Sequence, residues 1–429
     1  MAPPLLKRLI KLIETLIIDH IGANGEGIPK PPHGGLSVPF TLPGEIVSVV
    51  ENGNKALLME LKKPSSERVT PPCTYFGECG GCSLQHWQQK AYQLWKTNLV
   101  LKILAARGLT CERPSFIQCA PRERRRITLA ARATKDGQVV GFHQFHTHNV
   151  VSIESCTIAK PEIVAQFAAI RKLAAIFANT SKSFHITVTL CDNGIDLAFF
   201  DCSHPDEDQR RKLTSEALKF GFIRVTVNAE LIVETQKPTV RFGRVSVEIP
   251  SGGFLQATVV SEHAMAELVL EGLNKSKTAA DLFCGSGSFT FRMAEKMKVF
   301  AVEGDPFALN ALERSARRNI EGLKPIQTQH RDLFSRPLSK KELETFDGLI
   351  FDPPRAGAEQ QTREIAKSNI TQLVAVSCNP VTLARDLRIL VDGGYKLDRI
   401  YLIDQFLWSS HCEVVAHLSK RKLKPDWTL

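Results

Sequence analysis

The sequence predicts an α/β protein in which a Rossmann-like domain follows two smaller domains rich in β-strands. From about residue 253 onward, short apolar stretches alternate with amphipathic helical stretches, which is the pattern of a parallel sheet covered by helices. Residues 14–62 and 112–250 instead contain closely spaced strand-like stretches separated by polar and glycine-containing turns. A chain of 429 residues is also too long for a single hydrophobic core. We therefore expect several domains, with the α/β domain last.

Taken in order, the first expected element is a compact five-stranded barrel of the oligonucleotide-binding kind, in residues 1–65. A structural cap without a ligand is the alternative for this region. A linker rich in Pro and Ser follows at 62–72. A helix is expected at 84–107, because its apolar residues recur at three- and four-residue spacing before Gly108. We assign residues 66–83 and 112–252 to a mostly β central domain, and residues 84–111 and 253–429 to the α/β domain.

Composition and charge favour a nucleic-acid partner in a reducing compartment. The net charge of +10 and the pI near 9.0 favour a polyanionic partner, with nucleic acid ahead of a membrane surface. No apolar run reaches the roughly 18 residues of a membrane helix, and charges interrupt the stretch at 5–18, which makes a poor signal peptide. Eleven cysteines without an export signal indicate reduced thiols. We expect a cytoplasmic monomer with no membrane association and no obligate protein partner.

Three closely spaced cysteines predict a metal centre. Cys73, Cys79 and Cys82 have the spacing C-x5-C-x2-C, and the glycines among them let the backbone wrap closely around a soft metal. Zinc ribbons usually pair two C-x2-C halves, and the second half is missing, so an iron–sulfur cluster is favoured over zinc. A chance group of structural cysteines is the remaining alternative. The fourth ligand must come from elsewhere, and the candidates are Cys111, Cys119, Cys156, Cys191 and Cys202.

A run of arginines in the central domain predicts a phosphate-binding face. Four arginines lie at the base of an expected hairpin, and a fifth ends its first strand. Arginine side chains on such a face can bind the phosphates of a nucleic acid. A solvated charged edge is the alternative. The arginines in question are Arg122, Arg124, Arg125, Arg126 and Arg132.

A glycine turn in the α/β domain predicts a nucleoside site. Residues 279–290 read as a strand that runs into a glycine turn and a helix, and Glu303 ends the next strand. Glycines allow a ligand to approach the backbone closely, and an acidic residue at that place can accept ribose hydroxyls. The dinucleotide pattern G-x-G-x-x-G is absent. Asp281 and the Asp-Pro-Pro sequence beginning at Asp352 favour S-adenosylmethionine over NAD.

Cys378 is the candidate nucleophile. It follows an apolar strand at 371–377, and Pro380 suits the first turn of a helix. Cys378 therefore lies in a strand-to-helix turn, at the edge where α/β sheets bind ligands. A thiol in that position can act as a nucleophile, and an inert packed cysteine is the alternative. Glu413 begins the last expected strand and is a candidate base, or else a strand-end ion-pair partner.

A nucleoside site, a thiol and a carboxylate together fit one reaction. A thiolate adds to C6 of a uracil ring, C5 then takes a methyl group, and a base removes the C5 proton so that the thiol leaves. Uracil C5 is too weak a nucleophile without this covalent activation. The target base must also be flipped out of any stack.

Five sequence motifs resemble those of the bacterial RNA uracil-5-methyltransferases. They are P-C-T-Y-F-G-E-C-G-G-C, D-L-F-C-G-S-G-S-F-T, F-D-P-P-R-A-G-A, V-S-C-N-P-V-T-L-A-R-D and H-C-E-V-V-A-H-L. The resemblance covers nearly the whole chain. Within the family, the chain looks like the 23S ribosomal RNA branch, which has an N-terminal TRAM domain and a [4Fe-4S] cluster, rather than the tRNA branch, which lacks both.

The resemblance implies a role for individual residues. Cys378 would be the nucleophile, Glu413 the base and Cys156 the fourth ligand of a structural cluster. Asp352 would also contact the target uracil. Thr258 and Ser288 both stand at positions where the family often has Asn. The residues implied to line the S-adenosylmethionine site are Gln256, Phe283, Gly285, Ser288 (the second departure from Asn), Glu303, Asp332 and Asp352.

Three other functions remain as alternatives. The same chemistry could act on tRNA. An amino-group methyltransferase also uses Asp-Pro-Pro, but such enzymes usually place an aromatic residue next, where this chain has Arg355. A non-catalytic RNA-binding iron–sulfur protein is the third alternative, against which the intact pair of Cys378 and Glu413 counts.

Overall fold

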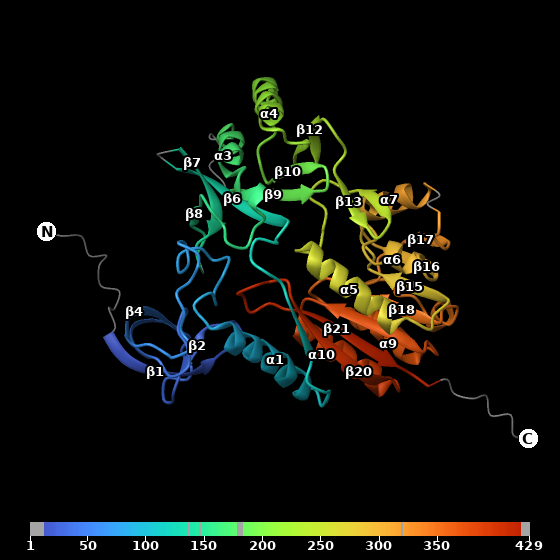
Figure 1. Cartoon of the computed structure of the whole chain (residues 1–429), viewed down its shortest axis with the longest axis horizontal. Helices are drawn as coiled ribbons and strands as arrows, with labels where there is room; N and C mark the ends of the chain where they lie inside the picture. Colours follow the sequence, from blue (N-terminus) through green and yellow to red (C-terminus); the bar gives the residue numbers. More distant parts are fainter. Residues whose placement is uncertain (1–12, 135–136, 146, 178–182, 319–320, 422–429) are drawn as a thin grey trace, which may run out of the picture. The chain divides into compact units, whose positions relative to one another are not determined.

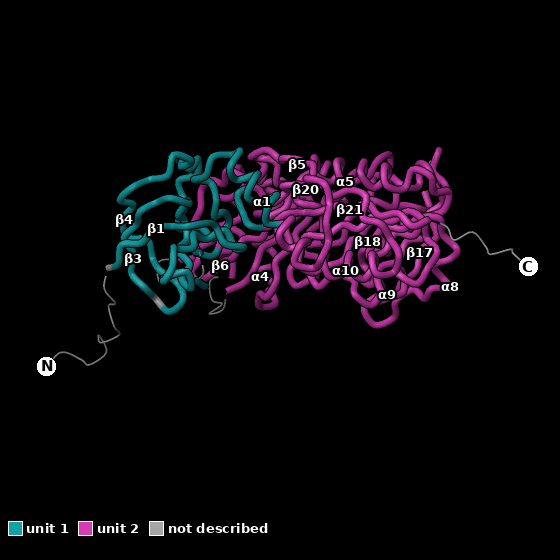
Figure 2. Tube along the Cα trace, turned by 90° about the horizontal axis from the view of Figure 1, so that it is seen from below, with its two compact units in different colours: residues 1–99, 143–148, 408–410 teal, residues 100–142, 149–407, 411–429 magenta. Residues whose placement is uncertain are grey.

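The computed structural model describes residues 13–134, 137–145, 147–177, 183–318 and 321–421. Residues 1–12 and 422–429, which include most of the stretch considered as a signal peptide, lie outside the described part. The chain forms two compact units, shown in different colours in Figure 2. The first unit is Met1–Leu99, His143–His148 and Trp408–Ser410, and the second is Val100–Phe142, Asn149–Leu407 and His411–Leu429.

The first unit begins with a small closed barrel. Its sheet has the order β2-β1-β3-β4, made of β1 (Ile13–Ile21), β2 (Gly27–Pro29), β3 (Ile46–Asn52) and β4 (Lys55–Lys63). Residues 37–38 close this sheet, since they form bridges with both β2 and β4. Five segments therefore surround the core, as expected from the sequence. The buried core residues are Leu16, Ile18, Val38, Val47, Val49 and Ala56.

The second unit contains a seven-stranded sheet and an eight-stranded sheet. The seven-stranded sheet carries α2 (Pro161–Val164), α3 (Phe167–Ala175) and α4 (Glu207–Phe220), of which α3 and α4 contact each other (Figure 1). Its order is β12-β11-β10-β9-β6-β7-β8. The strands are β6 (Arg126–Thr134), β7 (Gly137–His143), β8 (Val150–Ser152), β9 (Phe184–Cys191), β10 (Gly194–Phe200), β11 (Arg224–Val227) and β12 (Glu230–Glu234).

The eight-stranded sheet is the Rossmann-like sheet that the sequence predicts. Its order is β17-β16-β15-β18-β19-β21-β20-β5, with the first five strands parallel and β21 antiparallel to both of its neighbours. The α/β fold class with additional β domains is thereby confirmed. The strands are β5 (Ser115–Gln118), β15 (Thr278–Leu282), β16 (Lys298–Glu303), β17 (Ile326–His330), β18 (Gly348–Phe351), β19 (Gln372–Ser377), β20 (Lys396–Asp404) and β21 (Glu413–Ser419).

Helices cover both faces of this sheet, because the central strands are apolar on both sides. In β19, Leu373 and Ala375 belong to one hydrophobic cluster, whereas Val374 and Val376 belong to another. The first cluster includes side chains of α9 and α10, and the second includes side chains of α5 and α6. The helices are α1 (Gln89–Ala105), α5 (Val259–Gly272), α6 (Thr290–Ala294), α7 (Pro306–Ala316), α8 (Lys340–Leu343), α9 (Glu359–Lys367) and α10 (Pro380–Asp392). None of the described helices is long and apolar enough to cross a membrane.

Two segments expected in the central domain instead extend the α/β part. β5 pairs in parallel with β20 at the edge of the eight-stranded sheet. A hairpin of β13 (Thr239–Phe242) and β14 (Val245–Glu248) packs its apolar side chains on α7. The assignment of residues 112–252 to one central domain is corrected at both ends, because a short strand pattern does not show which sheet the strand joins.

Candidate active site

The topology brings the predicted site residues to one edge of the eight-stranded sheet. The parallel strands β15, β16, β18 and β19 end there, so the residues that follow them, from Phe283 to Cys378, meet at that edge. Because β21 runs antiparallel to β19, with Val414 paired to Ser377, it begins at the edge where β19 ends. Glu413 is therefore close to Cys378 although 35 positions (413 − 378) separate them in the sequence.

The turn after β15 has the backbone that a ligand-binding loop needs. Phe283 and Gly285 both have positive φ angles, of 61° and 56°. A side chain at Gly287, where φ is 95°, would meet the ring of Phe291 at 2.8 Å, so only glycine fits there. Ser288 is half-buried in the same turn. The turn thus exposes backbone to a ligand close to the start of α6.

Glu303 is held at the end of β16 by backbone amides. Its Oε2 accepts the N–H of Gly285 at 2.8 Å, and its Oε1 accepts those of Gly304 and Asp305 at 2.7 and 2.8 Å. The first of these bonds joins the glycine turn to the neighbouring strand. This fixed carboxylate suits the ribose hydroxyls of a nucleoside.

Asp332 and two aromatic rings lie at the end of β17 and beside the glycine turn. Asp332 accepts the N–H of Phe334 at 2.9 Å and the hydroxyl of Ser335 at 2.6 Å, and these bonds lower the pKa of its carboxyl group. The rings of Phe283 and Phe334 are 5.4 Å apart. Phe334 is a site residue that the sequence did not suggest. Its 46% exposure, unusual for so large an apolar side chain, was not detectable from the sequence.

Asp281 is buried beneath the glycine turn. It is fully buried in β15 and accepts the hydroxyl proton of Thr290. Burial raises its pKa to about 7, and the charges of Asp352 and Glu303 contribute further. A buried carboxyl group below the turn ties the strand to the start of α6.

Three titratable groups, Cys378, Asp352 and Glu413, lie near one another at this edge. Burial, with the nearby charges of Glu413 and Asp352, raises the pKa of the half-buried Cys378 thiol to about 11. Burial also raises the pKa of Asp352 to about 7, and that of Glu413 well above its usual value. Raised carboxyl pKa values of this kind are typical of groups that transfer protons in a reaction.

A chain of side-chain amides joins the two carboxyl groups. Gln256 Nε2 donates to Asp352 Oδ2 at 3.2 Å, and Gln405 Nε2 donates to Gln256 Oε1 at 3.0 Å. Gln405 Nε2 also donates a short hydrogen bond to Glu413 Oε2. Gln256 was predicted as a cofactor residue, whereas Gln405 was missed. Its position in Asp-Gln-Phe, shortly before His-Cys-Glu, was the available signal.

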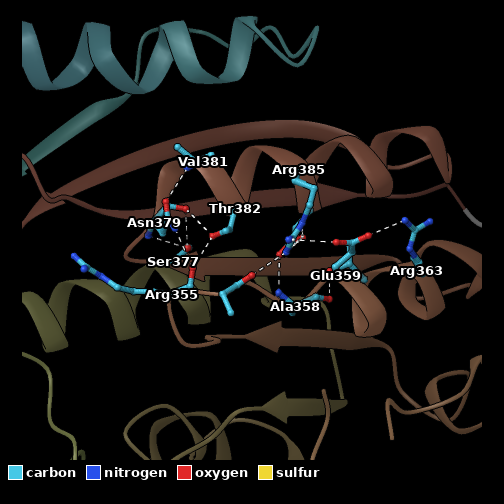
Figure 3. A network of polar contacts seen from close by, with 12 residues as sticks. Arg355, Ala358, Glu359, Arg363, Ser377, Asn379, Val381, Thr382 and Arg385 are labelled. Carbon is cyan, nitrogen blue, oxygen red and sulfur yellow. Dashed lines mark hydrogen bonds and ion pairs between the residues drawn. The ribbon is translucent and has the colours of Figure 1, made fainter. Parts of the chain in front are cut away.

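The turn that carries Cys378 is fastened to the loop after Asp352. Asn379 caps α10 by accepting the N–H of Val381 at 3.1 Å. Asn379 Nδ2 and Thr382 Oγ1 both donate to the carbonyl oxygen of Arg355, at 2.9 and 3.2 Å (Figure 3). The guanidinium of Arg355 contacts the ring of His411 and lowers the pKa of Cys378 by its charge.

The five arginines do not form one surface. Arg125 is 4% exposed and forms a buried ion pair with Glu262, so its assignment to an RNA-binding face is corrected: its charge is already neutralised inside the protein. Arg126 is partly buried and donates to Gly252 O at 3.1 Å. Arg124 lies 5.8 Å from the centre of the Phe406 ring. Arg122 and Arg132 are exposed.

The cysteine motif lies in the first unit. Cys73, Cys79 and Cys82 are half-buried and form no disulfide. The loop between them turns tightly, with the N–H of Cys79 bonded to Tyr75 O, and the N–H of Gly81 donates to Cys79 Sγ at 3.4 Å. The motif therefore places three half-buried thiols in and around one tight loop. Cys156 is half-buried and belongs to the second unit.

This fold and this site define an S-adenosylmethionine-dependent methyltransferase. A family model described as tRNA (Uracil-5-)-methyltransferase matches residues 223–421. The chain is 48% identical to an uncharacterized RNA methyltransferase of Brucella suis biovar 1 over 405 residues, covering 94% of this chain and 97% of the relative. We conclude that the chain belongs to the RNA (uracil-5-)-methyltransferase family and is an RNA methyltransferase.

Two further comparisons extend to nearly the whole chain. The 23S rRNA (uracil(1939)-C(5))-methyltransferase RlmD of Pectobacterium atrosepticum is 28% identical over 420 residues, covering 94% of this chain and 92% of the relative. The crystal structure of tRNA (uracil-54, C5)-methyltransferase from Pyrococcus abyssi with S-adenosyl-L-homocysteine superposes with a TM-score of 0.75. It covers 94% of this chain and 100% of its own length at 22% identity, and so shows that the fold is shared.

Proposed function

We propose that this enzyme transfers a methyl group from S-adenosylmethionine to C5 of a uridine in RNA, through a covalent bond between Cys378 and C6. The observation that carries the proposal is the arrangement of Cys378, Asp352 and Glu413 at one edge, with the pKa values of all three raised. A methyltransferase that modified an oxygen or an amino group would need no thiol at this place.

The first step is addition of the Cys378 sulfur to C6. Because the pKa of this thiol is about 11, it is protonated in the free enzyme at neutral pH. Negative charge on Glu413 and Asp352 opposes the thiolate, so positive charge entering the site favours it. Arg355 already supplies one such charge. The thiol proton is lost to solvent as the thiolate forms, and a sulfur lone pair then makes the S–C6 bond. The π electron pair of the C5–C6 double bond moves toward O4 of the uracil, and C5 becomes a nucleophile.

The second step is methyl transfer, for which S-adenosylmethionine supplies an electrophilic methyl group. The glycine turn with Gly285 and Ser288, the carboxylates of Glu303 and Asp332, and the ring of Phe283 would hold this donor. In support, Glu303 is already oriented by three backbone amides and Asp332 by two bonds. Gln256 would hold Asp352, which would in turn contact the uracil.

The last step releases the product. The carboxylate of Glu413 takes the proton from C5, the electron pair of the C5–H bond forms the C5–C6 double bond, and the C6–S bond breaks. The electron pair of that bond returns to Cys378 as a thiolate. A base with a raised pKa suits this step, because C5–H is a weak acid and a more basic carboxylate removes its proton faster.

We further propose that the substrate is 23S ribosomal RNA and that the enzyme acts as a monomer in the cytoplasm. The relative in Pectobacterium atrosepticum carries that substrate in its name, whereas the family model and the Pyrococcus abyssi structure are named for tRNA, which is the alternative. The N-terminal barrel would serve as a TRAM domain, and its closed five-segment sheet supports this role. The arginines left for RNA contacts are Arg122, Arg124, Arg126 and Arg132.

Cys73, Cys79, Cys82 and Cys156 are proposed to hold a [4Fe-4S] cluster with a structural role. Thiolates are the ligands such clusters need, and none of the steps above requires an electron. Protein purified without oxygen should be brown and contain about four irons per chain. A colourless, zinc-loaded preparation would exclude the cluster.

The decisive experiment for the reaction is Glu413→Gln with RNA and S-adenosylmethionine. Methyl transfer should proceed, but the product should remain bonded to Cys378, so that a protein–RNA adduct survives denaturing electrophoresis. Mass spectrometry of nucleosides from the two RNA classes, with and without the enzyme, then identifies the substrate. Free turnover by this variant would remove Glu413 as the base.

A further inference from the structure

Gln405 connects Glu413, the proposed base, through Gln256 to Asp352, which is proposed to contact the uracil. It follows β20 directly and is 3% exposed. Its Oε1 accepts the backbone N–H of Ala257 at 3.0 Å, and its Nε2 contacts Gln256 Oε1 and Glu413 Oε2. Every polar atom of this amide is therefore used inside the protein.

The Ala257 contact decides which way the Gln405 amide faces. A backbone N–H can only donate a hydrogen bond, so the Gln405 atom facing Ala257 must be the oxygen. Ser261 Oγ lies 3.0 Å from the same oxygen and shares its one proton between this oxygen and Thr258 O. The nitrogen must then face the opposite way, with one hydrogen for each of its two acceptors.

The same reasoning fixes the second amide. Because Gln256 Oε1 accepts from Gln405, Gln256 Nε2 is the group that donates to Asp352 Oδ2. The backbone of Gln256 is itself anchored, since Arg125 Nε donates to Gln256 O at 3.1 Å and Arg125 is paired with the buried Glu262. The direction of the chain therefore runs from Ala257 through Gln405 and Gln256 to Asp352, with Glu413 as a branch.

We propose that Gln405 is the positioning residue of the release step: it keeps Glu413 Oε2 occupied as an acceptor, so that Oε1 is the oxygen that takes the C5 proton. This inference rests on the proposed function. Without the Gln405 N–H, the carboxyl group can rotate and place its proton on either oxygen. The Gln405 hydrogen bond also lowers the pKa of Glu413 against the opposing effect of burial, which keeps more of the group in the carboxylate form.

The test is a single-turnover assay with methyl-labelled S-adenosylmethionine that measures methyl transfer and release separately. Gln405→Met keeps the side-chain length and removes both donors. Gln405→Glu keeps the shape of the side chain and an oxygen facing Ala257. Its second carboxylate oxygen, however, replaces the donor nitrogen and lies against two acceptors, Gln256 Oε1 and Glu413 Oε2. In both variants we expect release to slow at least about tenfold and the adduct to accumulate, while methyl transfer changes less than about threefold. The pH at half-maximal release should rise, because the pKa of Glu413 rises.

Ser261→Ala is the matched control. It removes the other side-chain contact of Gln405 Oε1, but Ala257 still fixes the direction of the amide, so release should change less than about twofold. A structural role for Gln405 alone would slow methyl transfer and release in parallel without moving the pH profile, and that result would overturn the inference. If Glu413→Gln traps an adduct and the Gln405 variants do not, only this inference fails. If Glu413→Gln traps none, the proposed base itself is wrong.

Discussion

Two pairs of carboxyl groups lie at the same edge of the eight-stranded sheet but have opposite environments, which differ in burial and in the hydrogen bonds they accept. Glu303 and Asp332 receive several backbone and hydroxyl hydrogen bonds, and the pKa of Asp332 is lowered. Asp352 is half-buried and Glu413 is buried, each accepts a hydrogen bond from one side-chain amide, and the pKa of each is raised. The two pairs thus differ in the supply of hydrogen-bond donors, and under the proposed function the first pair would hold the methyl donor while Glu413 of the second pair would take the proton.

The largest effect should come from Cys378, the proposed nucleophile, which lies near Asp352 and Glu413. Cys378→Ala should lower turnover by about 10⁴-fold or more, because no covalent activation of C5 remains. Its affinity for S-adenosylmethionine, measured by calorimetry, should stay within about twofold of the parent enzyme. Parent-like turnover would exclude the covalent route, and a parallel loss of affinity would show that the two halves are not separable.

Asp352→Asn should have the next largest effect. The amide of the variant cannot take up a proton as the carboxylate does. Its oxygen can still accept the N–H of Gln256, but in the other orientation its NH2 group would face that N–H, donor against donor. We expect the maximal rate to fall about a hundredfold, with little change in donor affinity. A change below about threefold in the maximal rate would instead assign Asp352 to ligand binding, together with Glu303 and Asp332.

Asp332→Asn should affect binding only. The side chain lies in the half proposed to hold the donor. In the variant the remaining carbonyl oxygen can still accept the N–H of Phe334, and the new amide nitrogen can donate to Ser335 Oγ, so the side chain stays in place. The apparent Michaelis constant for S-adenosylmethionine should rise about tenfold at an unchanged maximal rate. A fall in the maximal rate with an unchanged Michaelis constant would contradict the assignment of Asp332 to donor binding.

The smallest effect concerns stability and pH. The pKa of Asp281 is about 7 in the folded protein and 3.8 when the chain is unfolded. The folded state therefore binds more protons between these values, and its stability falls as pH rises through that window. Asp281→Asn removes this loss, so the ligand-free variant should gain stability relative to the parent as pH rises from about 5 to about 8, by on the order of 1–3 kcal/mol. Chemical denaturation at the two pH values measures the gain. A constant difference would mean that Asp281 does not titrate in this range.

The sequence predicted the ends of strands better than the environments of side chains. Cys378 and Asp352 could be placed at the ligand-binding edge because each directly follows an apolar strand. Arg125 was misjudged, since a run of arginines does not show which member meets the buried Glu262. Gln405 was missed because its importance depends on which way an amide faces. That direction is fixed by Ala257, which lies 148 positions away.

The clamp on the carbonyl oxygen of Arg355 has a consequence for anyone who would redirect this scaffold to another pyrimidine. Asn379 and Thr382 both donate to the same main-chain oxygen. The distance between the Cys378 thiol and Asp352 is therefore set by the backbone and not by the choice of side-chain rotamers. Redesign is therefore better begun at the side chains of Arg355 and His411, whose mutual contact can be exchanged without loosening that frame.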